Sequence, residues 1–306
     1  MSITHWVYIL LIYGVHVSGN DSVSSADQPV SERGFLGFLL GPCRCRCGIP
    51  NREARLVGGE YLRGHEFPWA SLVQLPGNLS FPATLINDKH LLTSANTVIG
   101  YTPSDLKVTV GLFDRCFADV SSMNLSINRI IIHPDFSPGN RAHDIALLEL
   151  SNPVRFERRI SPICLATPNT RYLGQVATVY SWTQAISKNE TTDTSQTIKS
   201  CRPRKLGLPI LGYEECLNAA SNSNYVSIDK GCIGVIGSFS PICEVDSGGA
   251  VTFRSRQGVY ELIGILSDKN VCDSAARPSV ALYTTINDHI SWITQNTRDA
   301  CYCVKT

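Results

Sequence analysis

The sequence predicts an all-β protein, because short apolar runs recur along the chain after residue 59. Clusters of Gly, Pro, Asn and Asp separate these runs, which is the spacing of antiparallel strands in a barrel or sandwich. A helical period is convincing in one place only, near the end of the chain. The predicted strands cover residues 69–75, 84–86, 106–112, 127–132, 145–150, 176–182, 251–253, 260–266 and 281–285.

The predicted helix covers residues 285–296. Its apolar residues Ile286, Ile290 and Ile293 recur at helical spacing, and Trp292 lies beside them. Residues 213–219 form a second, shorter candidate. Helices are therefore expected to be accessory to the strands.

The composition of the chain limits the classes of function that it can have. The chain has 306 residues, 43% of them hydrophobic, and a formal net charge of +1. It is long enough for a full core and has no electrostatic bias toward nucleic acid or anionic membranes. Its 12 cysteines lack the paired spacing of a zinc site, so disulfides in an oxidising compartment are favoured. No metal or cofactor is expected.

The beginning of the chain indicates secretion. The apolar run from Trp6 to Val17 is too short for a membrane span, so residues 1–19 are interpreted as a signal peptide. No membrane anchor is expected. Glycosylation sequons, which favour surface loops in a secreted protein, occur at Asn20, Asn78, Asn124 and Asn189.

The strongest chemical signal is the segment from Asp246 to Gly249, Asp-Ser-Gly-Gly. Such a turn lifts the Ser247 hydroxyl clear of the backbone and aims N–H groups at an anion. The tetrapeptide alone is also ordinary turn composition. Supporting segments lie at residues 55–59, 91–96, 144–148, 162–165, 209–216 and 290–293.

Together these segments resemble the chymotrypsin-like serine protease family over residues 56–297. The resemblance implies two six-stranded antiparallel β-barrels with a C-terminal helix. Residues 20–55 then form a prosegment and residues 298–306 a cysteine-containing tail. In the family, cleavage at the position of Arg55 frees an α-amine, here that of Leu56, which pairs with the aspartate at Asp246. The alternative is that Arg55 is an exposed loop residue.

The resemblance makes Ser247 the nucleophile and Asp144 the orienting carboxylate, but the histidine position holds Asn96. A carboxamide cannot accept a proton near neutral pH. By analogy with a triad knockout, this loss alone costs on the order of 10⁶ in turnover. His143 precedes Asp144 and is expected to point away from Ser247, since adjacent strand residues face opposite sides. The remaining candidates are interpreted as structural: His90, His133 and His289.

Two further departures weaken catalysis. Val245 replaces the glycine whose N–H joins that of Ser247 in the family's oxyanion hole. A β-branched residue resists the turn conformation that aims this N–H, and losing one such donor costs about 2.7–4 kcal/mol. In the substrate pocket, Pro241 replaces the aspartate that recognises Lys or Arg. The pocket wall, Ser-Trp-Gly in the family, reads Ser267-Asp268-Lys269. Recognition of a basic side chain is therefore not expected.

Cysteine usage follows the family only in part. The resemblance implies bridges Cys47–Cys164, Cys216–Cys232 and Cys243–Cys272, and it makes Cys116–Cys201 plausible because the two loops are neighbours in that fold. Two disulfides of the family have lost both of their cysteines in this chain. Phe81 and Thr97 occupy the positions of one pair, and Ala177 and Phe253 occupy those of the other.

Four cysteines remain, two in the prosegment and two in the tail: Cys43, Cys45, Cys301 and Cys303. In the family fold both regions lie on the face opposite the active-site cleft, so we expect bridges between them. Pairing within each Cys-x-Cys, which is strained, and an intermolecular bridge are the alternatives.

The leading hypothesis is a secreted, non-catalytic serine protease homologue that serves as a binding or regulatory module, with cleavage after Arg55 as its switch. Its expected partners are proteins, among them other proteases, their substrates or their inhibitors, and not nucleic acid. The oligomeric state does not follow from the sequence. The alternative is a weak endopeptidase that uses Ser247 with another base.

Overall fold

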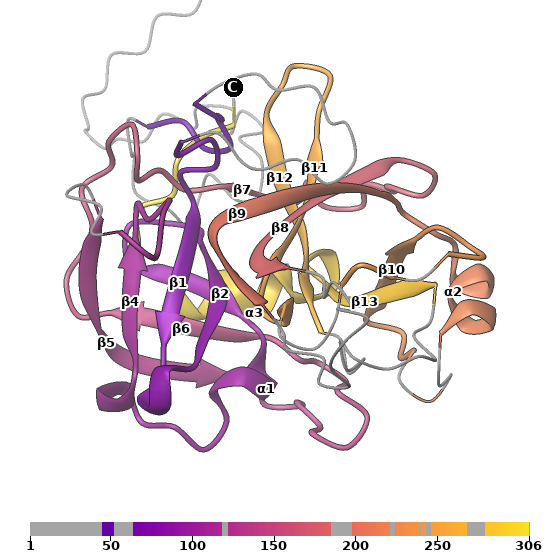
Figure 1. Ribbon diagram of the computed structural model, residues 1–306, viewed down its shortest axis with the longest axis horizontal. Helices are drawn as coiled ribbons and strands as arrows, with labels where there is room; N and C mark the ends of the chain where they lie inside the picture. Colours follow the sequence, from indigo (N-terminus) through magenta and orange to yellow (C-terminus); the bar gives the residue numbers. More distant parts are fainter. Residues whose placement is uncertain are drawn as a thin grey trace, which may run out of the picture.

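We describe the protein from a computed structural model, which covers residues 45–51, 64–117, 122–184, 198–220, 224, 226–238, 240–242, 246–267 and 279–305. Two curled β-sheets lie side by side, the first built from the N-terminal half and the second from the C-terminal half (Figure 1). Within these residues, no helix has the length and apolar character needed to cross a membrane.

The first sheet is a closed barrel with strand order β1-β2-β3-β6-β5-β4, and β4 pairs with β1 to complete it. Its interior is lined by apolar side chains that are almost completely buried, such as Val73, Leu91 and Leu147. The strands are β1 (Ala70–Gln74), β2 (Ser80–Leu85), β3 (His90–Thr93), β4 (Lys107–Val110), β5 (Met123–Ile132) and β6 (Ala146–Leu150).

The second sheet has the order β10-β13-β12-β11-β8-β9, and the short β7 pairs in parallel with β12. A single bridge between Ile210 and Ile233 brings the end of β9 to β10 and curls the sheet into a half-barrel. The strands are β7 (Cys164–Leu165), β8 (Val176–Gln184), β9 (Ile198–Pro209), β10 (Lys230–Gly234), β11 (Ala250–Arg254), β12 (Tyr260–Leu266) and β13 (Val280–Thr285).

The predicted all-β, two-barrel fold is confirmed, with the second barrel incompletely closed. All nine predicted strand segments overlap a strand, but β3, β7, β9 and β10 lie outside these segments. β9 is rich in Lys and Arg, and it is a strand because it pairs with β8 along most of its length. Cys201, expected at the end of a long polar loop, therefore lies within β9.

The helical elements are short. They are η1 (Pro76–Asn78), α1 (Ala95–Val98), η2 (Pro103–Asp105), α2 (Tyr213–Ala219), η5 (Asn287–His289) and α3 (Ile290–Asn296). The candidate helix at residues 213–219 is confirmed as α2.

The predicted start of the C-terminal helix at residue 285 is wrong. The N–H of Thr285 donates to Asp229 O and that of Ile286 to Ile263 O, so these donors are engaged outside the helix. A 3₁₀ turn follows, and α3 begins at Ile290. The predicted apolar face is correct, since Ile286, Ile290 and Ile293 are all buried.

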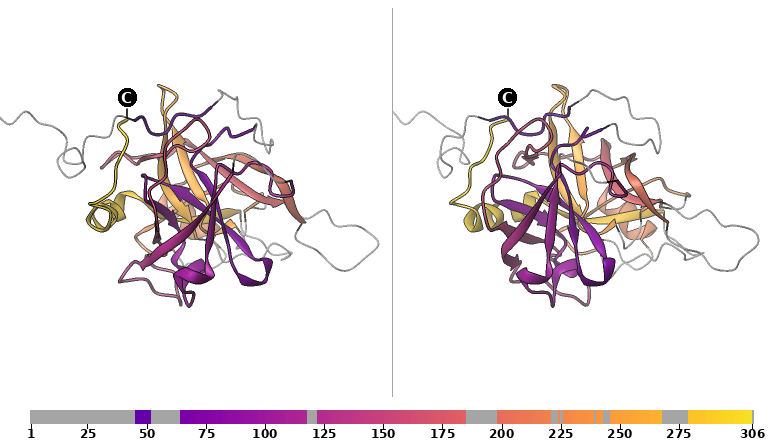
Figure 2. Two further views of the ribbon diagram at one scale, coloured as in Figure 1. Left: turned by 90° about the vertical axis from the view of Figure 1, so that its left-hand side faces the viewer. Right: turned by 60° about the vertical axis from the view of Figure 1, so that its left-hand side comes forward.

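The segment before the first barrel is held against the C-terminal tail. The tail rises from α3 and runs beside residues 45–51 (Figure 2). Cys47 N–H donates to Val304 O, and Val304 N–H donates to Cys45 O. Disulfide Cys45–Cys303 joins the two segments covalently.

Candidate functional site

The turn carrying Ser247 docks against the first barrel at its Thr93 edge. Gly248 adopts a φ of +92°, and a Cβ placed there would lie 2.3 Å from Thr93 Oγ1 and 2.6 Å from Pro82 O. Both observations require glycine. The Gly248 N–H donates to Leu266 O over 2.8 Å, which fixes the turn to β12. Ser247 itself is only 1% exposed.

Asp144 lies between the two sheets and is completely buried. Its Oδ1 accepts hydrogen bonds from Ser94 Oγ at 2.7 Å and from the Asn96 N–H at 2.8 Å. Its Oδ2 accepts one from Ser267 Oγ at 2.6 Å. Three neutral donors thus hold the carboxylate, which stabilises its charge in a site that excludes water.

A buried lysine extends this network. Lys230 in β10 is 5% exposed, and its Nζ donates to Ser267 Oγ over 2.9 Å and to Thr284 Oγ1 over 2.7 Å. Thr284 Oγ1 donates in turn to the carbonyl of Asp144. The sequence analysis missed Lys230, because a single lysine in an unpredicted strand carries no local signal of burial.

Ser267 was expected in the wall of the substrate pocket, and the structure shows what its hydroxyl does. It receives a hydrogen bond from Lys230 and donates one to Asp144, so it links a cation to the carboxylate. The following pocket residues, Asp268 and Lys269, lie outside the described part of the chain.

Asn96 is the second residue of the short helix α1, and it contributes its backbone N–H to Asp144. Among the residues that the structure describes, no histidine donates a hydrogen bond to the Asp144 carboxylate. His143 lies instead against His133 and His289.

The strand geometry from which His143 was expected to point away from Ser247 is wrong. His143 is not in a strand. It lies in the turn before β6 with a left-handed φ of +51°.

A cavity of about 220 Å³ adjoins the serine turn. Asp246, which is 4% exposed, and Pro241 contribute to its lining. The apolar walls come from β8, β9, β12 and the segment before the serine turn, through Val179, Leu206, Leu266 and Ile242. Lys205 also lines the cavity, but its ammonium is paired with Glu66 Oε1 at 2.7 Å.

Several predicted site residues fall outside the described residues: Arg55, Leu56, Val245, Cys243, Cys272, Asn20 and Asn189. Of the other two sequons, Asn78 ends the 3₁₀ turn η1. Asn124 is exposed but lies in strand β5, where its Oδ1 accepts a hydrogen bond from Thr109. The expectation of a surface loop is wrong for Asn124.

The disulfides implied by the resemblance are present wherever the structure describes both partners. They are Cys47–Cys164, Cys116–Cys201 and Cys216–Cys232. Cys45–Cys303 is the expected tie between prosegment and tail, and Cys301 is also disulfide-bonded. Ala177 in β8 and Phe253 in β11 occupy the positions of a disulfide that the family has and this chain lacks, and they lie directly opposite each other in the sheet.

The two-barrel fold and the serine turn define a trypsin-like serine protease scaffold, and comparison with known proteins agrees. The model of the family described as Trypsin matches residues 56–293, so the chain belongs to that family. It is 30% identical over 287 residues to Serine protease 7 of Drosophila melanogaster, covering 86% of this chain and 70% of that protein. It is also 30% identical over 280 residues to Phenoloxidase-activating factor 3 of Holotrichia diomphalia, covering 84% and 76% respectively.

A more distant similarity extends to vertebrates. Vitamin K-dependent protein C of Mus musculus is 28% identical over 254 residues, which cover 79% of this chain and 51% of that protein.

Proposed function

We propose that this protein is a secreted, non-catalytic member of the trypsin family that acts as a binding or regulatory module and is switched by cleavage after Arg55. The observation that carries the proposal is the environment of Asp144. The residue at the histidine position, Asn96, offers this carboxylate a backbone N–H, and the other two donors are hydroxyls.

Acyl transfer needs a proton acceptor beside the serine, and among the described residues no imidazole is hydrogen-bonded to Asp144. A serine hydroxyl becomes a strong nucleophile only when an adjacent base takes its proton. Asn96 cannot do so near neutral pH. The burial of Ser247 at 1% exposure further limits access by a substrate carbonyl. Asp144 then has a structural role, because it ties hydroxyls from both sheets together.

The cavity beside Asp246 supports the proposed switch. Its apolar walls suit a leucine side chain, and the Asp246 carboxylate suits a free α-amine. Cleavage after Arg55 would create a chain end of this kind at Leu56. Insertion of that end would reshape the loops around the cavity, which alters the surface offered to a partner.

The partner we propose is a protein in the extracellular fluid, such as another protease, its substrate or its inhibitor. The disulfides favour an oxidising compartment. One relative is named an activating factor, and a module that controls another protein is the corresponding role for this chain.

Labelling with a fluorophosphonate tests the absence of catalysis. Protein cleaved after Arg55 is treated with a tagged probe, with Ser247→Ala as the matched negative control and bovine trypsin as the positive control. We expect the cleaved protein to label no more than the Ser247→Ala variant. Labelling at Ser247 together with peptide hydrolysis would instead establish the weak endopeptidase.

A capture experiment tests the switch. Cleaved protein and an uncleavable Arg55→Gln variant are immobilised and exposed to the native extracellular fluid. We expect a protein partner to be retained by one form at least tenfold more than by the other. Equal retention by both forms would contradict a cleavage-controlled module.

A further inference from the structure

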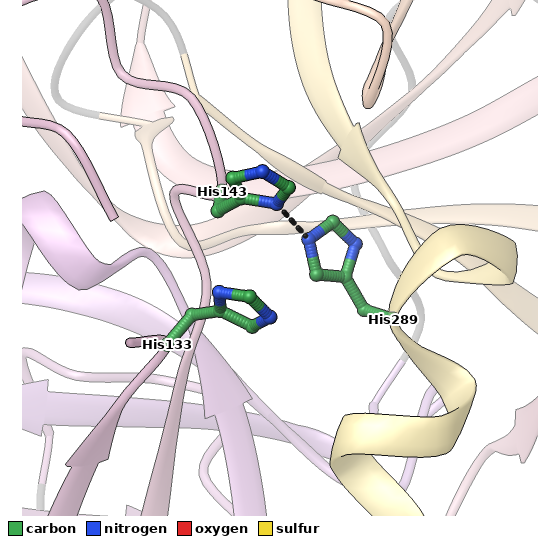
Figure 3. Close-up of side chains that lie close together, drawn as sticks. All are labelled: His133, His143 and His289. Carbon is green, nitrogen blue, oxygen red and sulfur yellow. Dashed lines mark hydrogen bonds between the residues drawn. The ribbon is translucent and has the colours of Figure 1, made fainter. Parts of the chain in front are cut away.

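Three histidines that are far apart in the sequence converge at one place between the two sheets. His133 follows β5, His143 lies in the turn before β6, and His289 ends the 3₁₀ turn before α3 (Figure 3). One ring nitrogen from each lies within 4.8 Å of those of the other two. The sequence analysis treated His133 and His289 singly as structural, because neither local sequence places them near each other.

The spacing suits a metal ion. His143 Nδ1 is 3.1 Å from His289 Nε2. Two nitrogens bound tetrahedrally at zinc distances lie about 3.3 Å apart, so this pair needs little movement. The His133 ring stacks on the His143 ring, with centroids 4.8 Å apart and planes at 13°. Binding would require the His133 side chain to turn out of this stack and to shift by about 1.5 Å, which brings its nitrogen to the same separation.

The surroundings already orient the rings. The Nδ1 of His289 is 2.7 Å from Thr285 O, so this nitrogen carries a proton and leaves the Nε2 lone pair directed at His143. His143 is held by its backbone N–H, which donates to Asp229 Oδ2 over 2.8 Å. The Asp135 N–H donates to His133 Nδ1 over 3.3 Å, and His133 would give up this hydrogen bond when it binds the ion.

Charge and access also favour a cation. Asp229 is 2% exposed, and its Oδ2 is 4.0 Å from His143 Nδ1, so a buried carboxylate compensates the charge of an ion. The His143 side chain is 34% exposed, which leaves a path from solvent and room for a water as fourth ligand.

We propose that His133, His143 and His289 form a binding site for one divalent transition-metal ion, with zinc as the favoured ion. Imidazole nitrogens are the ligands that zinc, copper and nickel prefer. The ion would replace the proton shared between His143 Nδ1 and His289 Nε2, and that proton would move to His143 Nε2. Two ligands come from the first barrel and one from the segment leading into α3, so the ion would tie the two halves together. The proposed metal site does not depend on whether the protein is a non-catalytic regulatory module.

Cobalt binding tests the site directly. Metal-free full-length protein is titrated with Co²⁺, and we expect one equivalent to produce the visible absorption of tetrahedral cobalt. One equivalent of Zn²⁺ should then remove that absorption. Zn²⁺ at about 100 times its dissociation constant should raise Tm by about 5 °C or more. Absence of cobalt absorption at millimolar Co²⁺ would overturn the proposal.

Variants locate the ion. His143→Gln and His133→Gln should each weaken binding at least tenfold, whereas His65→Gln, which removes a histidine outside the cluster, should leave it unchanged. A second readout uses Trp292, whose ring centroid is 5.0 Å from that of His133. Cu²⁺ should quench its fluorescence in the wild type, and most of the quenching should disappear in Trp292→Phe. Unchanged cobalt binding in both cluster variants would show that the ion binds elsewhere.

Discussion

At the scale of single residues, Asn96 stands at the position that the family resemblance assigns to a histidine, while the groups around it are retained. Asp144 remains completely buried and accepts three hydrogen bonds. Lys230 Nζ donates a hydrogen bond to the hydroxyl of Ser267, which is one of these three donors. A buried carboxylate with such partners stabilises the fold irrespective of catalysis, which gives a physical reason for its presence without a histidine.

We predict that Asn96→His alone does not produce trypsin-like activity. The new imidazole would supply a base, but Val245 remains at the position of an oxyanion donor and Pro241 at the position of the specificity aspartate. One missing oxyanion donor costs about 10²–10³ in kcat. Cleaved Asn96→His protein should therefore hydrolyse an arginine peptide at least about 10³-fold more slowly than trypsin in kcat/KM. A rate near that of trypsin would show that these two residues do not limit the chemistry.

A buried ion pair gives a stability prediction. Lys205 and Glu66 are each 2% exposed, and Lys205 Nζ lies 2.7 Å from Glu66 Oε1. Removing one partner leaves an uncompensated buried charge, so Lys205→Met should lower the free energy of unfolding by about 3–5 kcal/mol. The double variant Lys205→Met/Glu66→Gln should recover part of this loss in urea denaturation.

The control is the surface pair of Arg129 and Glu149, in which the arginine side chain is 60% exposed. Arg129→Met should cost about 0–1 kcal/mol, since solvent screens such a pair. Equal costs for Lys205→Met and Arg129→Met would contradict the role given to the buried pair.

At the scale of elements, the tail is joined to the segment before the first barrel by the Cys45–Cys303 disulfide and by the backbone hydrogen bonds of Val304. Gly48 shows how closely that segment packs against β12: its φ is +68°, and a Cβ there would lie 2.2 Å from Tyr260 O. Near the end of the tail, Lys305 Nζ lies 2.6 Å from Glu261 Oε1 in β12 and donates to Thr167 Oγ1. The tail thus joins residues 45–47 to the second sheet.

The tail contact should depend on pH. Burial acts to raise the pKa of Glu261, but hydrogen bonds from Lys305 and Thr167 outweigh it and hold the pKa below its ordinary value of 4.5. A carboxylate with a depressed folded-state pKa contributes stability above its unfolded pKa, and this contribution is lost as pH falls through the folded pKa. Glu261→Gln should therefore be less stable than wild type at pH 7, and the difference should shrink below pH 4.5.

Chemical denaturation over a pH series measures this difference. Glu157→Gln, which changes an exposed carboxylate, is the matched control and should show no comparable difference at any pH. A Glu261→Gln difference that stays constant into acid would show that lost packing, and not the charge, is responsible.

At the scale of the whole molecule, disulfides join regions that are far apart in the chain. Cys45–Cys303 spans 258 residues and Cys47–Cys164 spans 117. Two independent bridges therefore hold residues 45–47 to the body, one through the tail and one near β7. Long-range bridges of this kind stabilise by restricting the unfolded chain, each taken alone by about 5 kcal/mol in the chain-entropy model.

We predict that a trypsin-like protease nicks the protein after Arg55 and that both pieces remain joined. On a non-reducing gel the nicked protein should migrate as one species, and reduction should release the N-terminal piece. The double variant Cys47→Ser/Cys164→Ser should behave in the same way, because Cys45–Cys303 remains. Two fragments from the nicked wild type without reductant would contradict the covalent arrangement.

The sequence by itself determined the strand-rich class, the apolar face of the C-terminal helix, the serine turn and the identity of Asn96. These features are carried by residues close together in the chain: alternating or continuous apolar runs, the turn-forming glycines, and short motifs around Ser247 and Asp144. The resemblance to a family then supplied the two-barrel arrangement and the bridges Cys47–Cys164 and Cys216–Cys232.

Only the tertiary structure decided which distant residues meet. The polar residues of β9 form a strand because β8 offers them a pairing edge, and Lys230 is buried because Ser267 and Thr284 accept its hydrogen bonds. The convergence of His133, His143 and His289 likewise requires the two sheets to be packed. Local patterns record burial and turn preference, whereas such contacts depend on how separate segments of the chain are brought together, and no short stretch of sequence contains that information.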